Sequence, residues 1–146
     1  MHFHIRPAIA ADLPEALSLL RNAGLPTEDL AAEYLLQVAE NDAGLLGVIG
    51  MQHFGDTALL RSLVVTPSAR GTGTGRALVH ALEAAASRSG VRALWLLTID
   101  ADEFFARLGY SVRKRQRAPR AIRNSNEFAR LCPADAILMK KNLTRG

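Results

Sequence analysis

One short segment of the chain combines residue types and a spacing that suit a defined chemistry. Glycines alternate there with threonines between two arginines, and glycine lacks the Cβ that would cover neighbouring backbone N–H groups. An apolar run precedes the segment, and apolar residues at helical spacing follow it. A glycine turn leading into a helix N-terminus offers N–H groups and a positive dipole end to an anion. We therefore predict a phosphate-binding loop made of Arg70, Gly71, Thr72, Gly73, Thr74, Gly75 and Arg76.

Two common phosphate-binding motifs fit this loop poorly. A P-loop requires Lys followed by Ser or Thr after its last glycine, whereas Arg76 and Ala77 stand there. A dinucleotide fingerprint has the spacing Gly-x-Gly-x-x-Gly after the first strand of a βαβ unit. Here the spacing differs, and several predicted strands precede the loop.

The loop matches the pattern Arg/Gln-x-x-Gly-x-Gly/Ala, and three other segments accompany it in order. Residues 5–13 pair a short strand with a helix start, residues 63–67 end a strand at Pro67, and residues 104–110 place aromatic residues around Gly109. With these segments, the chain resembles the GNAT superfamily of N-acetyltransferases over nearly its whole length.

The resemblance implies an α/β (α+β) GNAT fold with a mixed, mostly antiparallel central sheet flanked by helices. It also implies acetyl-CoA as co-substrate, bound where the fourth and fifth strands separate, with direct transfer of the acetyl group to an amine. Backbone amides near Leu63 and Val65 would pair with the pantetheine and the thioester carbonyl, and such an amide stabilises a developing oxyanion. The residues implied for CoA binding are Leu63, Val64, Val65, Phe105 and the loop residues Arg70, Gly71, Thr72, Gly73, Thr74, Gly75 and Arg76.

The chain departs from the family at the position of the general acid. Many relatives carry Tyr as the second aromatic residue of the late helix, but this chain has Phe105, which cannot transfer a proton. A thiol is acidic enough for the CoA thiolate to leave unaided. Tyr110 is a second candidate acid, although its position is one usually packed in the core. The general base stays open among Glu33, Glu40, His53 and Asp56.

Arg61 is a candidate for holding an anionic acceptor. On a strand with a period of two it would share a face with Leu63 and Val65 and look toward the thioester. Its guanidinium could pair with a carboxylate, phosphonate or arsonate in bidentate fashion. The alternative is an arginine whose stem covers an apolar edge and whose head reaches solvent.

The C-terminal part resembles a narrower group through Ile122, Glu127, Phe128 and residues 131–133. This group is the bacterial arsenic-resistance N-acetyltransferases, followed more distantly by the N-acetylglutamate synthases. Both imply a small, anionic, amino-acid-like amine, or its arsenic or phosphorus analogue. We expect Cys132 to be packed rather than nucleophilic. The alternatives are a protein or peptide N-acetyltransferase and a non-catalytic acyl-CoA-binding regulatory module.

Apolar patterns and turn residues define the elements that position these groups. We expect strands over residues 3–6, 34–39, 45–54, 58–65, 93–98, 110–113 and 136–140, with hairpin turns at residues 40–44 and 55–57. We expect helices after a capping box formed by Asp12 and Glu15, from Ala77 to Gly90, over residues 102–108, and around residues 126–131, with a short helix or loop over residues 25–30. Trp95 should pack in the core.

Composition narrows the class of protein. With 146 residues and 49% apolar side chains, we expect one domain over residues 1–146. No apolar run approaches a membrane span or a signal peptide, so we expect a cytoplasmic protein without a membrane partner. One cysteine and four scattered histidines predict no metal. The formal net charge is +4, and arginines are concentrated in residues 113–123. No aromatic residue lies between them to stack on bases, which favours small anionic ligands over nucleic acid. A homodimer fits the resemblance, because dimers are frequent in the superfamily.

Overall fold

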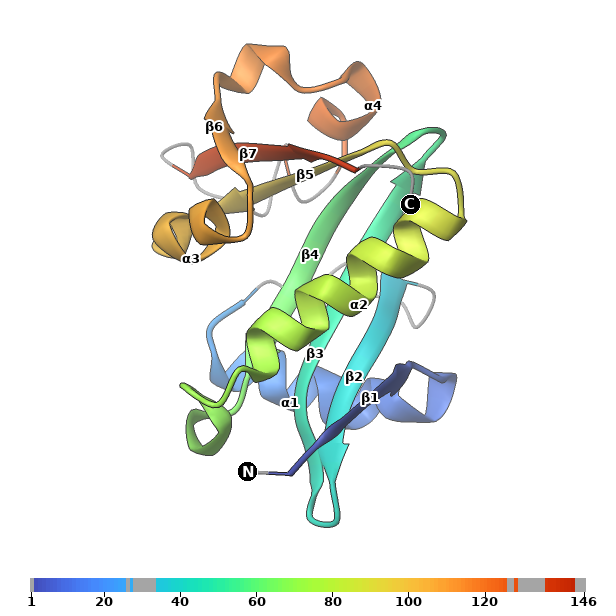
Figure 1. The fold of residues 1–146 in the computed structure, drawn as a ribbon, viewed down its shortest axis with the longest axis vertical. Helices are drawn as coiled ribbons and strands as arrows, with labels where there is room; N and C mark the ends of the chain where they lie inside the picture. Colours follow the sequence, from blue (N-terminus) through green and yellow to red (C-terminus); the bar gives the residue numbers. More distant parts are fainter. Residues whose placement is uncertain (1, 26, 28–33, 126–127, 129–135, 144–146) are drawn as a thin grey trace. The chain divides into compact units, whose positions relative to one another are not determined.

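The computed structural model spans the chain, and the structure describes residues 2–25, 27, 34–125, 128 and 136–143. Figure 1 shows the elements in chain order. The strands are β1 (His4–Pro7), β2 (Leu35–Asn41), β3 (Gly44–Phe54), β4 (Thr57–Val65), β5 (Ala93–Thr98), β6 (Ser111–Arg113) and β7 (Ile137–Asn142). The helices are α1 (Leu13–Asn22), α2 (Thr74–Arg88), α3 (Asp102–Arg107) and α4 (Arg120–Arg123), with short 3-10 helices η1 (Ala10–Asp12), η3 (Pro67–Ala69) and η4 (Arg115–Arg117).

Within the described residues, the strands form one seven-stranded sheet in the order β1-β2-β3-β4-β5-β7-β6. β4 and β5 are parallel, whereas β1 with β2, β2 with β3, β5 with β7, and β6 with β7 pair antiparallel. The ladder between β4 and β5 joins only Thr57–Leu59 to Ala93–Trp95, although both strands continue beyond it. The predicted mixed, mostly antiparallel sheet flanked by helices is confirmed.

The chain forms two compact units. The first unit holds residues 1–51 and 61–85, and the second unit holds residues 52–60 and 86–146. β3, β4 and α2 each contribute residues to both units. The single domain expected over residues 1–146 stays a prediction.

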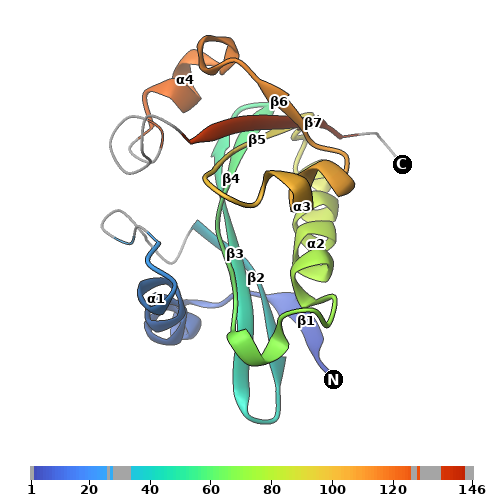
Figure 2. The same ribbon diagram turned by 90° about the vertical axis from the view of Figure 1, so that its left-hand side faces the viewer.

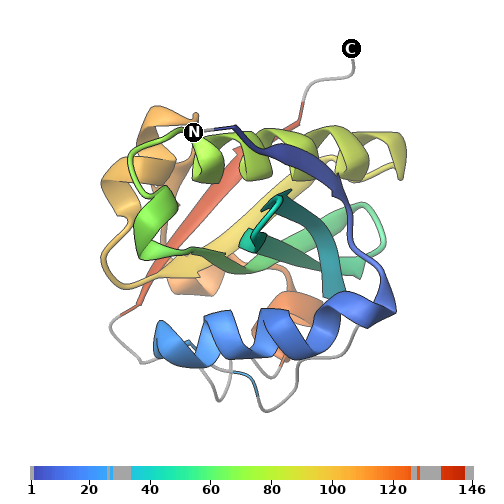
Figure 3. The same ribbon diagram turned by 90° about the horizontal axis from the view of Figure 1, so that it is seen from below.

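In the first unit, α1 and α2 lie on opposite faces of the sheet made by β2, β3 and β4 (Figure 3). α2 packs closely on the sheet at Gly47, where a Cβ would lie 2.8 Å from the Val64 carbonyl oxygen and 3.0 Å from Leu78 Cδ1. Any larger residue there would force α2 or β4 to shift. The α1 face is filled by the buried residues Ala16, Leu20, Leu35, Val38, Leu45, Val48 and Val64.

The capping box predicted from Asp12 and Glu15 is wrong. Asp12 precedes α1 but makes no capping bond to it, and its Oδ2 accepts a hydrogen bond from the Ile9 N–H at 2.8 Å. Glu15 Oε2 instead accepts a hydrogen bond from the N–H of Leu45 on β3 at 2.9 Å. Both carboxylates bond to partners outside α1, and the partner of Glu15 lies 30 residues away, where a pattern of local spacing cannot reveal it.

In the second unit, α3 and α4 lie on opposite sides of β5 and β7 (Figure 2). β5 is buried along nearly its whole length, as its continuous apolar sequence predicts. The expected core position of Trp95 is confirmed by an exposed fraction of 4%. The core on the α4 side consists of Leu59, Trp95, Ala118, Ile122, Phe128 and Leu138.

Most predicted elements are found within one or two residues of their expected bounds. α2 starts earlier than expected, at Thr74, so the last three residues of the predicted loop of residues 70–76 form the first turn of this helix. η4 and α4 were not predicted. The short helix or loop over residues 25–30 and the helix over residues 126–131 fall almost entirely outside the described residues, as does Cys132.

Candidate functional site

The end of β4 is tied to β3 before the chain turns into α2. The Thr66 N–H donates to the Leu46 carbonyl at 2.8 Å, and η3 follows immediately. The Thr72 N–H then donates to the Ala69 carbonyl at 3.3 Å. The first helical bond of α2 runs from the Ala77 N–H to the Gly73 carbonyl at 3.0 Å. The segment predicted to bind phosphate thus connects the end of β4 to the start of α2.

Gly71 and Gly73 hold this loop in the left-handed conformation. Their φ values are +76° and +87°, which residues with a Cβ adopt at a cost. A Cβ at either position would meet no heavy atom within 4 Å. Both glycines are required for their backbone conformation and not for lack of space, and the space beside them is open.

The start of α2 supplies hydrogen-bond donors for an anion. The N–H groups of Thr74, Gly75 and Arg76 precede the first intrahelical donor and have no partner inside the helix. The helix is 15 residues long, so its dipole adds positive potential at this end. Thr72 and Thr74 join their hydroxyls at 2.7 Å, and Thr74 is 1% exposed. Their hydroxyls therefore hold the loop together and leave its backbone to face a ligand.

Two arginines flank the loop at the surface. The side chains of Arg70 and Arg76 are both exposed. Each is available to add a charge-assisted hydrogen bond to a phosphate held by the loop. All seven predicted loop residues lie together in the first unit with Leu63, Val64 and Val65.

β4 carries an irregularity directly before these three residues. Ser62 has a φ of +60° and is the one described residue other than glycine with a positive value. Val64 packs in the α1 core, whereas Val65 Cγ2 lies beside Gly47 and Leu78 on the α2 side. Val64 and Val65 thus lie on opposite faces of the sheet.

Arg61 therefore does not follow the simple pattern on which its prediction rested. The left-handed residue Ser62 interrupts the period of two between Arg61 and Leu63, so a shared face does not follow from the spacing. The alternative of a head that reaches solvent is wrong, because Arg61 is 2% exposed, and the role of Arg61 toward an acceptor stays a prediction. Its guanidinium carbon lies 5.3 Å from the centroid of the Tyr34 ring.

Phe105 of α3 and Tyr110, which follows that helix, lie in the second unit. Phe105 is 5% exposed and Tyr110 is 3% exposed. Their ring centroids are 5.4 Å apart in an edge-to-face arrangement, and the Lys141 Nζ lies 5.5 Å from the Tyr110 centroid. This burial favours a packing role for Tyr110, and the acid role stays a prediction.

The candidate general bases have different surroundings. Glu33 lies outside the described residues. Glu40 accepts hydrogen bonds from Arg6 at 2.9 and 3.1 Å, and these bonds hold the pKa of its carboxyl below the usual range. His53 and Asp56 are exposed at the β3–β4 hairpin, and His53 Nε2 contacts the Gly55 carbonyl at 2.5 Å. Glu40 is thus engaged in the ion pair, and the choice of base stays open.

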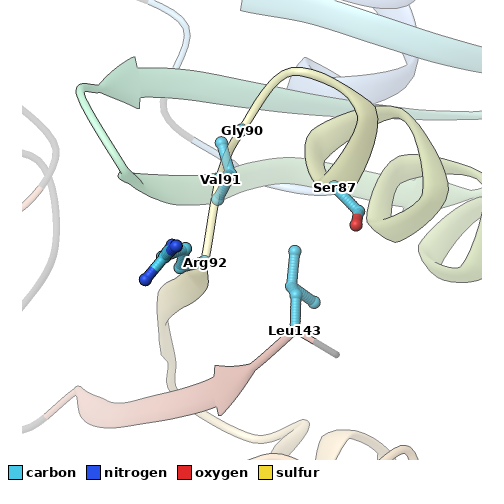
Figure 4. A pocket seen from close by; sticks show the side chains of 5 residues that line it. All are labelled: Ser87, Gly90, Val91, Arg92 and Leu143. Atoms are coloured by element: carbon cyan, nitrogen blue, oxygen red, sulfur yellow. The ribbon is translucent and has the colours of Figure 1, made fainter. Parts of the chain in front are cut away.

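A shallow pocket at the junction of α2 and β5 has little functional chemistry. Its lining residues are Ser87, Gly90, Val91, Arg92 and Leu143, and its volume is about 240 Å³. In Figure 4 the Arg92 side chain extends away from the space between Ser87 and Leu143. The side chains that remain around that space supply one hydroxyl and no charged group.

In the described part of the chain, His, Cys, Asp and Glu side chains form no group of three or more that could hold a metal ion. None of the helices described is long and apolar enough to cross a membrane.

The sequence itself matches a known family. Residues 32–112 match the sequence model of the acetyltransferase (GNAT) domain. Because this match covers more than half of the chain, the chain belongs to the GNAT acetyltransferase family. An uncharacterized N-acetyltransferase of Chlorobaculum tepidum is 36% identical over 87 residues, which are 59% of this chain and 56% of that protein. The match therefore spans only about half the length of this curated relative.

Solved structures share the fold. The N-acetylglutamate synthase of Neisseria gonorrhoeae, in complex with coenzyme A and N-acetyl-glutamate, aligns with a TM-score of 0.84 and 21% identity, over 99% of this chain and 36% of that one. A Mycobacterium tuberculosis protein in complex with CoA aligns with a TM-score of 0.82 and 22% identity, over 97% and 99% of the two chains. The ribosomal-protein-S18-alanine N-acetyltransferase of Escherichia coli aligns with a TM-score of 0.75 and 21% identity, over 99% and 96%.

Sequence reasoning missed two features of the first unit. Tyr34 was treated only as a strand residue, and nothing in the pattern links it to Arg61. The irregularity at Ser62 has no signal either, because serine is not a residue that marks a left-handed position.

Proposed function

We propose that this GNAT chain transfers the acetyl group of acetyl-CoA to the amine of a small, anionic, amino-acid-like molecule. The observation that carries the proposal is the loop of residues 70–76, with two left-handed glycines leading into the N-terminus of α2. This geometry suits the pyrophosphate of CoA. The CoA complexes of the related folds support the same reading.

The proposed roles follow from the groups that the first unit presents. The N–H groups of Thr74, Gly75 and Arg76 bind pyrophosphate oxygens, and Arg70 adds charge. Backbone amides of Leu63 and Val65 pair with the thioester carbonyl and the pantetheine, and the Leu63 amide stabilises the oxyanion formed when the amine attacks.

The proposed reaction needs a base for the acceptor amine but no protein acid for the leaving thiolate. The amine must lose a proton to attack, so a base is needed, directly or through water. Phe105 offers no proton to the leaving group, and the CoA thiolate is stable enough to leave without one. We therefore expect the rate to depend on the ionisation of the acceptor amine more than on a protein acid.

An amino-acid-like acceptor has the support of one related structure. The Neisseria gonorrhoeae enzyme binds N-acetyl-glutamate in its complex. In this chain, Arg61 is the residue that we propose for the acceptor's anionic group. The relatives reported above include no arsenic-resistance enzyme, so arsenical amino acids enter the proposal only as members of the same anionic class.

The test is a thiol-release assay with acetyl-CoA and a panel of acceptors. The panel holds acidic and neutral amino acids, phosphorus and arsenic amino-acid analogues, polyamines, and peptides with free N-termini. Turnover confined to anionic amino acids supports the proposal. Turnover on peptides alone would favour a protein N-acetyltransferase, and saturable CoA binding without turnover on any amine would favour a regulatory module.

A further inference from the structure

Three strands of the second unit bring a tryptophan and a lysine side by side on one sheet face. Lys140 of β7 pairs with Trp95 of β5 and with Ser111 of β6, so the three residues form one row across the sheet. Lys140 Nζ lies 5.1 Å from the centroid of the Trp95 ring. Arg113 joins this row, because its Nη1 donates to Ser111 Oγ at 2.7 Å.

The row borders a cavity of about 510 Å³, a size that suits a small-molecule ligand. Of its six lining residues, four are cationic and none is acidic. Like charges around one concave surface repel each other unless an anion lies among them. The lining residues are Trp95, Val112, Arg113, Lys114, Arg117 and Lys140.

Arg115, in the middle of the same basic segment, has a different role. Its guanidinium carbon lies 4.6 Å from the Phe128 ring centroid, and its Nη1 donates to the Ala136 carbonyl at 3.3 Å. Arg115 thereby fixes the segment to the protein, while its neighbours Arg113, Lys114 and Arg117 line the cavity. The basic segment is therefore more than a solvated charged face.

Trp95 adds a hydrogen-bond donor that needs an acceptor. The residue is 4% exposed, and within the described part of the chain its indole Nε1 is buried without a hydrogen-bond partner. A buried donor without a partner costs free energy, and an acceptor could reach this atom only if the surrounding side chains moved. The small exposure also prevents this ring from stacking on a nucleic-acid base, since stacking requires an open face.

We propose that this cavity binds a small molecule with at least two negative charges on phosphate or carboxylate groups, at a site separate from the loop of residues 70–76. Guanidinium groups of Arg113 and Arg117 suit such oxygens in bidentate fashion. Lys114 and Lys140 add charge, and Trp95 lines the same cavity. This site is additional to the one proposed for acetyl transfer, and its ligand would bind the basic residues Arg113, Lys114 and Arg117.

The experiment uses inorganic pyrophosphate as the probe and Trp95 as the reporter, because Trp95 is the only tryptophan in the chain. Pyrophosphate is titrated into the protein saturated with CoA, and again into the Gly73→Glu variant, in which the loop is blocked. We expect a saturable change in tryptophan emission and a matching calorimetric isotherm in both. The titration of the Gly73→Glu variant tests the cavity even if the chain binds no CoA, because the loop is blocked there without CoA.

Two double variants separate the cavity from general surface charge. Arg113→Gln with Arg117→Gln removes two cavity cations and should weaken pyrophosphate binding by at least about tenfold. Arg120→Gln with Arg123→Gln removes two exposed cations of α4 that do not line the cavity, and should leave the affinity within about twofold. Equal losses in both double variants, or no binding when CoA or Glu at position 73 blocks the loop, would overturn the proposal.

Discussion

The guanidinium carbon of Arg61 lies 5.3 Å from the centroid of the Tyr34 ring, with Arg61 only 2% exposed. A planar guanidinium stacks on an aromatic face in a way that an ammonium group cannot reproduce. We predict that Arg61→Lys lowers the free energy of unfolding by about 1–2 kcal/mol in urea titrations. The matched change Arg88→Lys, at an exposed position of α2, should have little effect.

Arg61→Lys also tests the acceptor. If Arg61 binds the acceptor's anionic group, KM for an anionic acceptor should rise by about tenfold or more, while the affinity for CoA stays constant. A loss of stability with an unchanged KM would assign Arg61 to the packing of the first unit alone.

Gly73 and Gly90 form a matched pair for testing the loop. Their φ values are +87° and +89°, and a Cβ at either position meets no heavy atom within 4 Å. Glu at either position should therefore cost a similar amount of stability, about 1–2 kcal/mol. Only Gly73→Glu should abolish CoA binding in a calorimetric titration, because only Gly73 lies at the N-terminus of α2. Retained affinity in this variant would remove the loop from the CoA site.

Ser62 should respond to substitution in an unusual way for a strand residue. Its φ of +60° suits glycine and disfavours a β-branched side chain. We predict that Ser62→Gly is neutral or stabilises by up to about 1 kcal/mol, while Ser62→Val destabilises by about 1–3 kcal/mol. Thermal unfolding of both variants measures the difference. The opposite order would mean that residue 62 has an ordinary extended conformation.

Acid should weaken the first unit through Asp12. Arg6 donates to both oxygens of Asp12, at 2.8 and 2.9 Å, and this pairing lowers the pKa of the Asp12 carboxyl. A carboxyl whose pKa is lower in the folded state stabilises the fold above its unfolded pKa, about 4, and that stability is lost as the pH falls through the folded value. We expect Asp12→Asn to lower stability by about 1–3 kcal/mol at pH 6.

The same stability difference between wild type and Asp12→Asn should be measured at acid pH. The difference between wild type and Asp12→Asn should shrink as the pH falls below the ordinary aspartate pKa of about 4 and wild-type Asp12 takes up a proton. Asp56→Asn, at the exposed β3–β4 hairpin, is the control and should change stability little at either pH. A constant difference across this range would mean that the ion pair with Arg6 does not carry the effect.

Tyr110 can be tested as an acid without disturbing its packing. Tyr110→Phe keeps the ring that meets Phe105 edge to face at 5.4 Å. We predict that kcat with the best acceptor stays within about threefold of wild type across the pH profile, because the thiolate needs no acid. A loss of about a hundredfold or more, with the basic limb of the profile removed, would instead make Tyr110 the general acid.

The sequence by itself determined the family, the order of the elements and the loop. Apolar runs and turn residues mark the meander from β2 to β4, the helix α2 and the buried strand β5, because each depends on contacts that repeat along the chain. The loop of residues 70–76 could also be predicted, since left-handed backbone positions such as Gly71 and Gly73 strongly favour glycine.

Only the tertiary structure decided how side chains distant in sequence meet. Asp12 and Glu15 have the spacing of a capping box, yet Asp12 bonds to Ile9 and Arg6 earlier in the chain, and Glu15 bonds to the N–H of Leu45, 30 residues away, which is within reach only once β3 is in place. Ser62 breaks the alternation of β4 without any local signal. The row of Trp95, Lys140 and Ser111 depends on β7 lying between β5 and β6, an order set by the packing of the whole sheet and not by the sequence of any one strand.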